Sequence, residues 1–246
     1  MRTGQKNENM PIDADFLRAV APLYDAGMGT ELVGPVLYSL VRMARPRRLL
    51  EVGLGYTTPF LLQALADSAA DHRREVATLA ARSEKNLLLP DYYREPYAPV
   101  LCGIDDQSHP GSTAGAVAEV VAGMGLEPFL KLVPGDFRGQ ARSLGAAHLP
   151  IDFVWFDCGG IAEYRDFLFE YWGVINPDGG LLVLHSTQTN LTIHSVISRL
   201  KLEQATTKFL DFEMVSLLEP HKHAQNSVTL IRFTAGVSQK FYSVEP

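Results

Sequence analysis

Five side chains that can hold a cation or exchange a proton stand at or just after the ends of apolar, strand-like runs. Four are carboxylates and the fifth is an imidazole. Carboxylates accept hydrogen bonds from hydroxyl and amino groups or balance a positive charge, and imidazole exchanges protons near neutral pH. The set suits the binding of a polar or cationic ligand together with a proton transfer, and it comprises Glu51, Asp105, Asp136, Asp157 and His185.

The first of these acids belongs to the stretch LLEVGLGYTT at residues 49–58. An apolar strand ends here in an acid, and a glycine-containing turn then opens a helix. Such a turn directs backbone N–H groups and a helix N-terminus toward a ligand, and Gly53 and Gly55 let that ligand approach the backbone closely. The pattern predicts a nucleotide-type cofactor site, but Glu51 disfavours a phosphate there and favours a cationic or hydroxyl-rich ligand.

The next two acidic strand ends extend this site. An acid at the tip of the strand beside the glycine turn can accept hydrogen bonds from a ribose diol, which makes Asp105 the stronger candidate. The alternative of a capping or solvated loop acid fits its neighbour Asp106 better than Asp105. Asp136 could bond an adenine amino group while Phe137 covers the ring, and Asp136 could equally cap the helix that follows.

A long connection at residues 71–99 departs from a compact α/β rhythm and contains three tyrosines among prolines. Connections of this length are uncommon unless they form lids or binding loops. Tyr92, Tyr93 and Tyr97 suit an aromatic wall beside a small organic substrate, since each offers an apolar face with a hydroxyl at its rim. The alternative is that they pack the insertion against the body of the protein or form an oligomer contact.

These residues need a scaffold that brings strand ends together, and the hydrophobic periodicity predicts one. Two helices at about residues 13–26 and 32–43 precede five alternating strand and helix units. The glycine-containing link between the two helices could fold over a ligand or simply turn. The runs 212–218 and 228–233 are joined too closely for a crossover helix, so they must pair as an antiparallel hairpin. We therefore predict a three-layer Rossmann-like α/β fold whose mostly parallel seven-stranded sheet ends in this hairpin.

Composition limits the classes of function. A chain of 246 residues, 46% hydrophobic and 20% charged, can bury one sizeable core without division into two domains. The formal charge of −6 opposes a broad nucleic-acid interface, which needs clustered Lys and Arg. Cys102 and Cys158 are too few for a disulfide framework, and no apolar run reaches the roughly 18 residues that span a bilayer. We expect a soluble, cytoplasmic protein with free thiols and with no nucleic-acid or membrane partner.

The ordered motifs resemble those of the class I S-adenosylmethionine-dependent methyltransferases over about residues 30–235. The resemblance rests on LLEVGLGYTT, LCGIDDQS, LVPGDF, FVWFDCGG and NPDGGLLVLHS, followed by the terminal hairpin. A sulfonium ligand carries positive charge and an ammonium group but no phosphate, which agrees with the acidic strand ends. The resemblance implies S-adenosylmethionine as cofactor, with contacts from Glu51, Gly53, Gly55, Thr57, Asp105, Asp106, Asp136, Phe137 and Asp157.

Within that group the chain is most similar to the small-molecule O-methyltransferases of the catechol type. That branch holds a magnesium ion through an acid after the fourth strand and an Asp-Asn pair after the fifth. Asp157 matches the acid, whereas His185-Ser186 stands in place of the pair, and imidazole is a poor ligand for magnesium. A divalent metal is therefore left open, with Asp157 and His185 as its ligands if the protein holds one.

Methyl transfer requires alignment of the acceptor with the sulfonium and a group that takes a proton where the acceptor carries one. His185 is the best candidate base, and Asp157 could orient it, accept the proton itself or ligate a metal. His221 and His223 in the hairpin loop could contribute to the substrate site, although loop histidines beside a lysine are more commonly solvated. The resemblance thus implies methyl transfer to a hydroxyl or amine of a small molecule, for example in natural-product biosynthesis.

Two other functions fit parts of the pattern. An NAD(P)-dependent oxidoreductase expects a ribose acid about 20 residues beyond the turn, whereas Asp105 lies roughly fifty beyond it. The second alternative is a cofactor-binding subunit that has lost catalysis. It stays open because His185-Ser186 replaces the Asp-Asn pair at the metal positions. We divide the chain into a tail with cap helices at 1–45, a methyltransferase domain at 46–235 with a lid-like insertion at about 71–99, and a tail at 236–246. The helical N-terminus and the insertion could support a homodimer.

Overall fold

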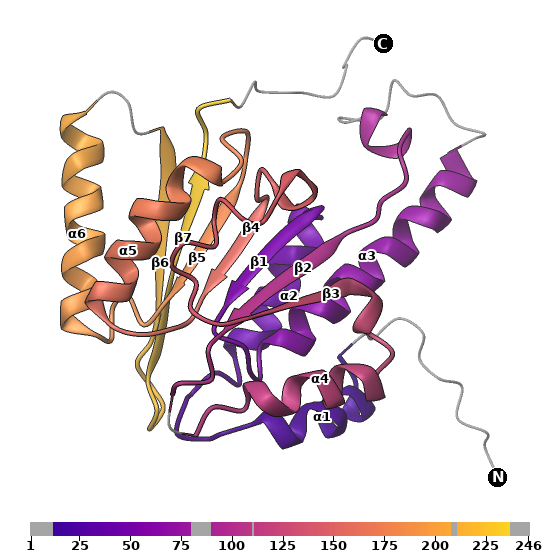
Figure 1. The fold of residues 1–246 in the computed structure, drawn as a ribbon, viewed down its shortest axis with the longest axis horizontal. Coiled ribbons are helices and arrows are strands. Elements are labelled where there is room, and N and C mark those ends of the chain that lie inside the picture. The colour runs from indigo at the N-terminus through magenta and orange to yellow at the C-terminus, as the bar shows by residue number, and fades with distance from the viewer. Residues whose placement is uncertain (1–11, 80–89, 110, 208–210, 237–246) are drawn as a thin grey trace.

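A single mixed sheet organises the chain in the computed structural model, which describes residues 12–79, 90–109, 111–207 and 211–236. The strand order is β3-β2-β1-β4-β5-β7-β6, and β7 runs antiparallel to both of its neighbours (Figure 1). The predicted seven-stranded Rossmann-like sheet with a terminal hairpin is confirmed. The strands are β1 Arg48–Val52, β2 Val100–Asp105, β3 Leu130–Pro134, β4 Phe153–Phe156, β5 Leu181–His185, β6 Phe212–Glu219 and β7 Asn226–Phe233.

Helices cover both faces of this sheet and give the three layers. One hydrophobic cluster joins one face of the sheet to the first four helices, and a second joins the other face to the last two (Figure 1). Alternate strand residues feed the two clusters: Leu49 packs into the first and Leu50 into the second, as the period of two in a strand requires. The helices are α1 Ala14–Val20, α2 Val33–Ala44, α3 Thr58–Leu79, α4 Ala114–Gly123, α5 Ile161–Tyr171 and α6 Leu191–Thr206.

The N-terminal segment differs from the prediction of one helix over residues 13–26. Asp13 caps α1 by accepting the N–H groups of Asp15 and Phe16, but the helix ends at Val20. Pro22 follows within a 3₁₀ turn, where its missing N–H costs no α-helical hydrogen bond. The chain then runs as a loop to the start of α2, and this loop reaches the functional edge of the sheet.

Within the connection at 71–99 the sequence predicts a separate polar helix over residues 75–86, but the first part of this helix is the continuation of α3. Its described portion extends α3 to Leu79, held to α2 by ion pairs of Arg42 with Asp71 and of Arg45 with Glu75. The remainder of that prediction, like both predicted tails, lies wholly or largely outside the described residues. None of the described helices is long and apolar enough to cross a membrane.

Candidate functional site

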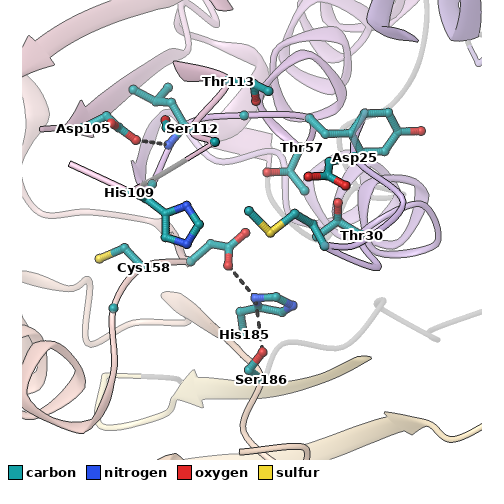
Figure 2. Close-up of a pocket in the computed structure, with 18 of the residues that line it drawn as sticks. Asp25, Thr30, Thr57, Asp105, His109, Ser112, Thr113, Cys158, His185 and Ser186 are labelled. Carbon is teal, nitrogen blue, oxygen red and sulfur yellow. Dashed lines mark hydrogen bonds and ion pairs between the residues drawn. The ribbon is translucent and has the colours of Figure 1, made fainter. Parts of the chain in front are cut away.

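A cavity of about 670 Å³ opens at the carboxyl ends of the parallel strands, which is the edge where ligands bind in open α/β sheets. This volume falls within the range of roughly 300–1,000 Å³ that small-molecule sites occupy. Its walls come from the glycine turn after β1, the loops after β2, β4 and β5, and the loop between α1 and α2 (Figure 2). Among the residues that line it, no lysine or arginine is found in the described part of the chain.

The glycine turn after β1 packs so closely against the loop after β4 that no side chain would fit at Gly53. Gly53 has a φ of +90°, and an added Cβ would stand 2.2 Å from the carbonyl oxygen of Asp157. Its N–H donates to the carbonyl of Ile104 at 3.0 Å, which ties the turn to the end of β2. Gly55 is also confined, with an added Cβ 3.3 Å from the hydroxyl of Thr113. At Gly53 only glycine allows both the positive φ and the close carbonyl oxygen, and the backbone of Gly53 and Gly55 lines the cavity.

Glu51 is fully buried beneath this turn. Its Oε1 accepts a hydrogen bond from the hydroxyl of Thr57 at 3.0 Å, and Trp155 Nε1–H donates to the same hydroxyl at 3.1 Å. Its Oε2 has no partner. Burial raises the pKa of this carboxyl to about 8, and the charges of Asp157 and Asp105 act in the same direction. Glu51 itself does not line the cavity, whereas Thr57, its hydrogen-bond donor, does.

Asp105 stands at the tip of β2 and lines the cavity. One carboxylate oxygen accepts the N–H of Leu54 at 2.7 Å (Figure 2). The other accepts the N–H of Gln107 at 2.6 Å. Asp106 also lines the cavity, and it accepts the N–H of Ser108 at 2.9 Å, which lowers the pKa of its carboxyl. Asp105 therefore bridges the loops after β1 and β2, while Asp106 acts within its own loop.

A second, smaller cavity of about 170 Å³ adjoins the first and shares Asp105 and Asp106 with it. Asp136 and Phe137 line this second cavity. Asp136 already pairs with Arg138 at 2.8 Å, and only 4% of Phe137 is exposed. The Phe137 ring packs against the aromatic rings of the core, so the structure leaves little of it to cover an adenine.

Asp157 and His185 meet at the centre of the main cavity, as their positions after β4 and β5 predict. His185 Nδ1 pairs with Asp157 Oδ1 (Figure 2). His185 Nε2 lies 2.6 Å from Asn226 Oδ1 at the start of β7. The residue that follows, Ser186, has a φ of +52°, and its N–H donates to the carbonyl of Ser227 at 2.7 Å. This unusual backbone turn closes the cavity wall beside the pair.

The pKa of His185 results from opposing effects. Burial lowers it, but the charge of Asp157 and the hydrogen bonds to Asp157 and Asn226 outweigh burial, so the pKa is raised. In the described ranges no group of three or more His, Cys, Asp or Glu side chains is arranged to hold a metal ion. The imidazole and the carboxylate at the position expected for a metal are bound to each other, so this donor set does not fit magnesium.

The three tyrosines of the insertion are not placed where the sequence predicts. They surround His72 of α3, whose ring lies 5.1 Å from Tyr92, 5.7 Å from Tyr93 and 5.8 Å from Tyr97. The Tyr97 hydroxyl donates to the carbonyl of Pro46 at 2.8 Å, just before β1 begins. The cluster therefore lies at the amino edge of the parallel strands, opposite the cavity. The alternative interpretation holds for these residues: they pack the insertion against the body.

The histidines of the hairpin loop also lie outside the cavity. His221 and His223 are exposed and do not line it. Between them, Lys222 turns toward the loop that joins α1 and α2, where its Nζ donates to the carbonyl of Gly29 at 2.7 Å and pairs with Glu31 at 3.0 Å. The hairpin thus contributes to the site by holding this loop, and the substrate-binding role expected of the two histidines has no support in their placement.

Several residues of the site escaped the sequence analysis. Asn226 precedes residue 228, where its strand was predicted to begin, and nothing in the local sequence indicates that it contacts His185. Thr30 and Met28 line the cavity from the loop between α1 and α2, for which a simple turn was the competing prediction. His109 lines the cavity although it is exposed, as expected of a loop histidine. Contacts between segments far apart in the sequence position these groups, so local patterns do not reveal them.

Topology defines the fold: the sheet order and the antiparallel last strand match the Rossmann-like fold of solved methyltransferase structures. No family model matches the chain, and no curated protein matches it by sequence. The particular resemblances are therefore to solved structures, and at their low sequence identities they establish the fold.

Three of these structures are O-methyltransferases, one of them putative by its description. The O-methyltransferase TomG from Streptomyces achromogenes, involved in tomaymycin synthesis and solved with S-adenosylmethionine, is 17% identical with a TM-score of 0.62, and 90% of each chain is covered. A putative O-methyltransferase from Klebsiella pneumoniae is 17% identical with a TM-score of 0.61, covering 92% of this chain and 93% of that one. An O-methyltransferase from Bacillus cereus, solved with S-adenosylhomocysteine, is 12% identical with a TM-score of 0.57, covering 89% and 96%.

Proposed function

We propose that the protein is an S-adenosylmethionine-dependent methyltransferase that acts on a hydroxyl or amine of a small molecule. The observation that carries the proposal is the row of carboxylates and bare glycine backbone along one wall of the cavity, with no lysine or arginine among the described lining residues. A dinucleotide or phosphorylated cofactor would need cations or free N–H groups there, whereas a sulfonium with an ammonium group needs acids. The solved structures with this fold that hold S-adenosylmethionine or S-adenosylhomocysteine add independent support.

The residues present fit this cofactor. The turn at Gly53 and Gly55 lines the cavity and suits its methionyl end, with the buried Glu51 beneath the turn. Asp105 suits the ribose hydroxyls, since each of its oxygens accepts one backbone N–H and keeps a lone pair free. The adenine would then reach the smaller cavity, where each oxygen of Asp136 accepts one bond from Arg138 and keeps a lone pair for the adenine amino group.

The remaining wall of the main cavity would receive the acceptor. Leu23, Met28 and Ile193 give it apolar surface, while Thr30 and Asp157 offer polar atoms. Methyl transfer needs little beyond alignment: the acceptor's lone pair forms the new bond to the methyl carbon, the electron pair of the broken S–C bond stays on sulfur, and any acceptor proton passes to a base of the protein. The absence of lysine and arginine from the described lining argues for an acceptor without a phosphate.

The competing functions are less well supported. An NAD(P)-dependent oxidoreductase would need the pyrophosphate cradle that Glu51 and the neighbouring acids oppose. A cofactor-binding subunit without catalysis would have the same fold, so an activity measurement must distinguish it from a methyltransferase. We further propose, from the sequence, a cytoplasmic protein that could form a homodimer, with cap helices before residue 46 and the catalytic domain over 46–235.

The test is transfer of a labelled methyl group. The purified chain is incubated with S-adenosylmethionine carrying an isotopic methyl and with panels of small phenols, enols and amines, and products are found by mass spectrometry. We expect label in at least one acceptor class and none with an Asp157→Ala variant. A chain that binds S-adenosylmethionine but labels no member of any panel would support the non-catalytic alternative.

A further inference from the structure

The hydrogen bonds around His185 assign it a role different from that of a general base. We infer that Asn226 and Asp157 hold His185 as a hydrogen-bond donor at both ring nitrogens, so that a fixed imidazolium stands where the O-methyltransferase branch places a divalent metal. Asn226 is then a positioning residue, and the Asp157 carboxylate is the group of this trio that remains able to accept a proton.

The orientation of the Asn226 amide is determined from two sides. Its Nδ2 donates to the carbonyl of Gly29 at 2.8 Å, and its Oδ1 accepts the N–H of Ser227 at 2.7 Å. Exchanging the amide oxygen and nitrogen would place two donors together and two acceptors together, which a buried side chain does not tolerate. The atom that faces His185 Nε2 at 2.6 Å is therefore an oxygen, and Nε2 must carry the proton.

The other ring nitrogen faces a carboxylate. His185 Nδ1 contacts Asp157 Oδ1, and only 14% of the His185 side chain and 24% of the Asp157 side chain are exposed. A bare Nδ1 beside an ionised carboxylate would set two lone pairs against each other in a site with little water, so a proton lies between them. Two neighbouring groups of the pair carry no charge. The ring centroids of Trp155 and His185 lie 5.5 Å apart, and the Ser186 hydroxyl lies 3.5 Å from His185 Nδ1.

The arrangement has two chemical consequences. A histidine that donates from both nitrogens has no lone pair for an acceptor's proton, so the prediction that His185 is the base is not supported. Its positive charge also occupies the position that a metal would take beside Asp157. The catalytic part of this inference rests on the proposed methyl transfer, in which the acceptor's proton would pass to Asp157, but the protonation of His185 does not depend on it.

Asn226 also joins this trio to the wall of the cavity. Its donor to Gly29 spans 197 residues of sequence and holds the loop that carries Met28 and Thr30. Gly29 fits closely there, since an added Cβ would stand 2.5 Å from the carbonyl oxygen of Ala224. One side chain thus fixes both the charge of His185 and the position of the acceptor wall.

The inference is tested by nitrogen-15 NMR of the full chain with labelled histidine, at neutral pH and without any cofactor or acceptor. His185→Gln identifies the signals of His185. We expect both of its ring nitrogens to show the chemical shifts of protonated nitrogen. Titration with Mg²⁺ or Mn²⁺ should cause no saturable change in these signals. A bare nitrogen in the unmodified protein, or saturable metal binding that Asp157→Asn abolishes, would overturn the inference.

Variants at the hairpin separate the role of Asn226 from general stability. Asn226→Leu should lose the slowly exchanging Nε2 proton, whereas Gln225→Leu, which removes an exposed amide from the adjacent position, should keep it. If Asn226→Leu does not fold, Asn226→Asp serves, because it retains the acceptor for Nε2 and should keep both nitrogens protonated. Retention of the proton in Asn226→Leu, or a neutral ring in Asn226→Asp, would contradict the inference. Failure of the proposed methyl transfer would show separately, as absent binding of S-adenosylmethionine with these spectra unchanged.

Discussion

The two sides of the cavity are built in different ways. The side proposed for the cofactor comes from strand ends and the turns that follow them, and its acids stand where successive strands finish. The opposite side depends on contacts between distant segments: the loop between α1 and α2, the end of β5 and the start of β7. The first kind of wall is dictated by local sequence and sheet topology, whereas the second exists only once the chain has folded.

The comparison predicts different sensitivities for the two sides. Substitutions in the strand-end turns should act on cofactor affinity, while substitutions in the distant contacts should act on the charge and shape of the acceptor side. A third region, the tyrosine cluster at the opposite edge of the sheet, should affect stability alone.

Gly53→Ala should have the largest effect. The new methyl group would stand 2.2 Å from the Asp157 carbonyl oxygen at a φ of +90°, so the turn must move. We expect affinity for S-adenosylmethionine to fall about 100-fold or more, since a strained, displaced turn costs on the order of 3 kcal/mol. Gly179→Ala is the matched control, because Gly179 has the same φ of +90° with nothing within 4 Å. Equal affinities of the two variants in calorimetry would mean that the turn is not a ligand site.

Asp105→Ala should weaken S-adenosylmethionine binding by about 10- to 100-fold, the range expected when a charged hydrogen-bond acceptor worth about 1.5–3 kcal/mol is lost. Asp106→Ala removes a carboxylate from the next position, and its loss should be smaller because Asp106 bonds within its own loop. Titration calorimetry of both variants distinguishes the two acids. A larger loss of affinity in Asp106→Ala would indicate that Asp106, and not Asp105, binds the ribose.

Glu51 should make stability depend on pH. Its folded-state pKa of about 8 exceeds the ordinary value of 4.5, so between these values the folded protein binds more protons than the unfolded chain. The free energy of unfolding must then fall as pH rises from about 4.5 to about 8, by up to roughly 1.4 kcal/mol per pH unit from this group. Denaturant titrations at several pH values should show a shallower fall in Glu51→Gln. Parallel pH profiles would show that the carboxyl is ionised in the folded state.

Tyr97→Phe should have the smallest effect on the site. Loss of the hydroxyl leaves the Pro46 carbonyl without this donor and should lower the free energy of unfolding by about 1–2 kcal/mol. Affinity for S-adenosylmethionine should not change, because the tyrosine cluster lies at the other edge of the sheet. A loss of affinity without a loss of stability would restore the insertion as part of the binding site.

The sequence predicted the fold and the cofactor side because both follow from short-range rules. Period-two burial, glycine turns and the close spacing of the last two strands specify the sheet, and the sheet order then brings Asp105 and Asp157 to one edge. The sequence did not predict the partner of His185, because Asn226 lies 41 residues away on an antiparallel strand whose register no local pattern determines. The tyrosines were misplaced for a related reason: an insertion's composition does not indicate which edge of the sheet it packs on.

The central claim is that the acidic edge of the sheet binds an adenosine that carries a positively charged sulfur. Titration calorimetry of the purified chain with S-adenosylmethionine, S-adenosylhomocysteine and NAD tests it most directly. We predict saturable binding of the first two ligands at one site per chain, sensitive to Asp105→Ala, and no binding of NAD. Binding of NAD in preference to S-adenosylmethionine, or no heat with either adenosyl ligand, would contradict the account.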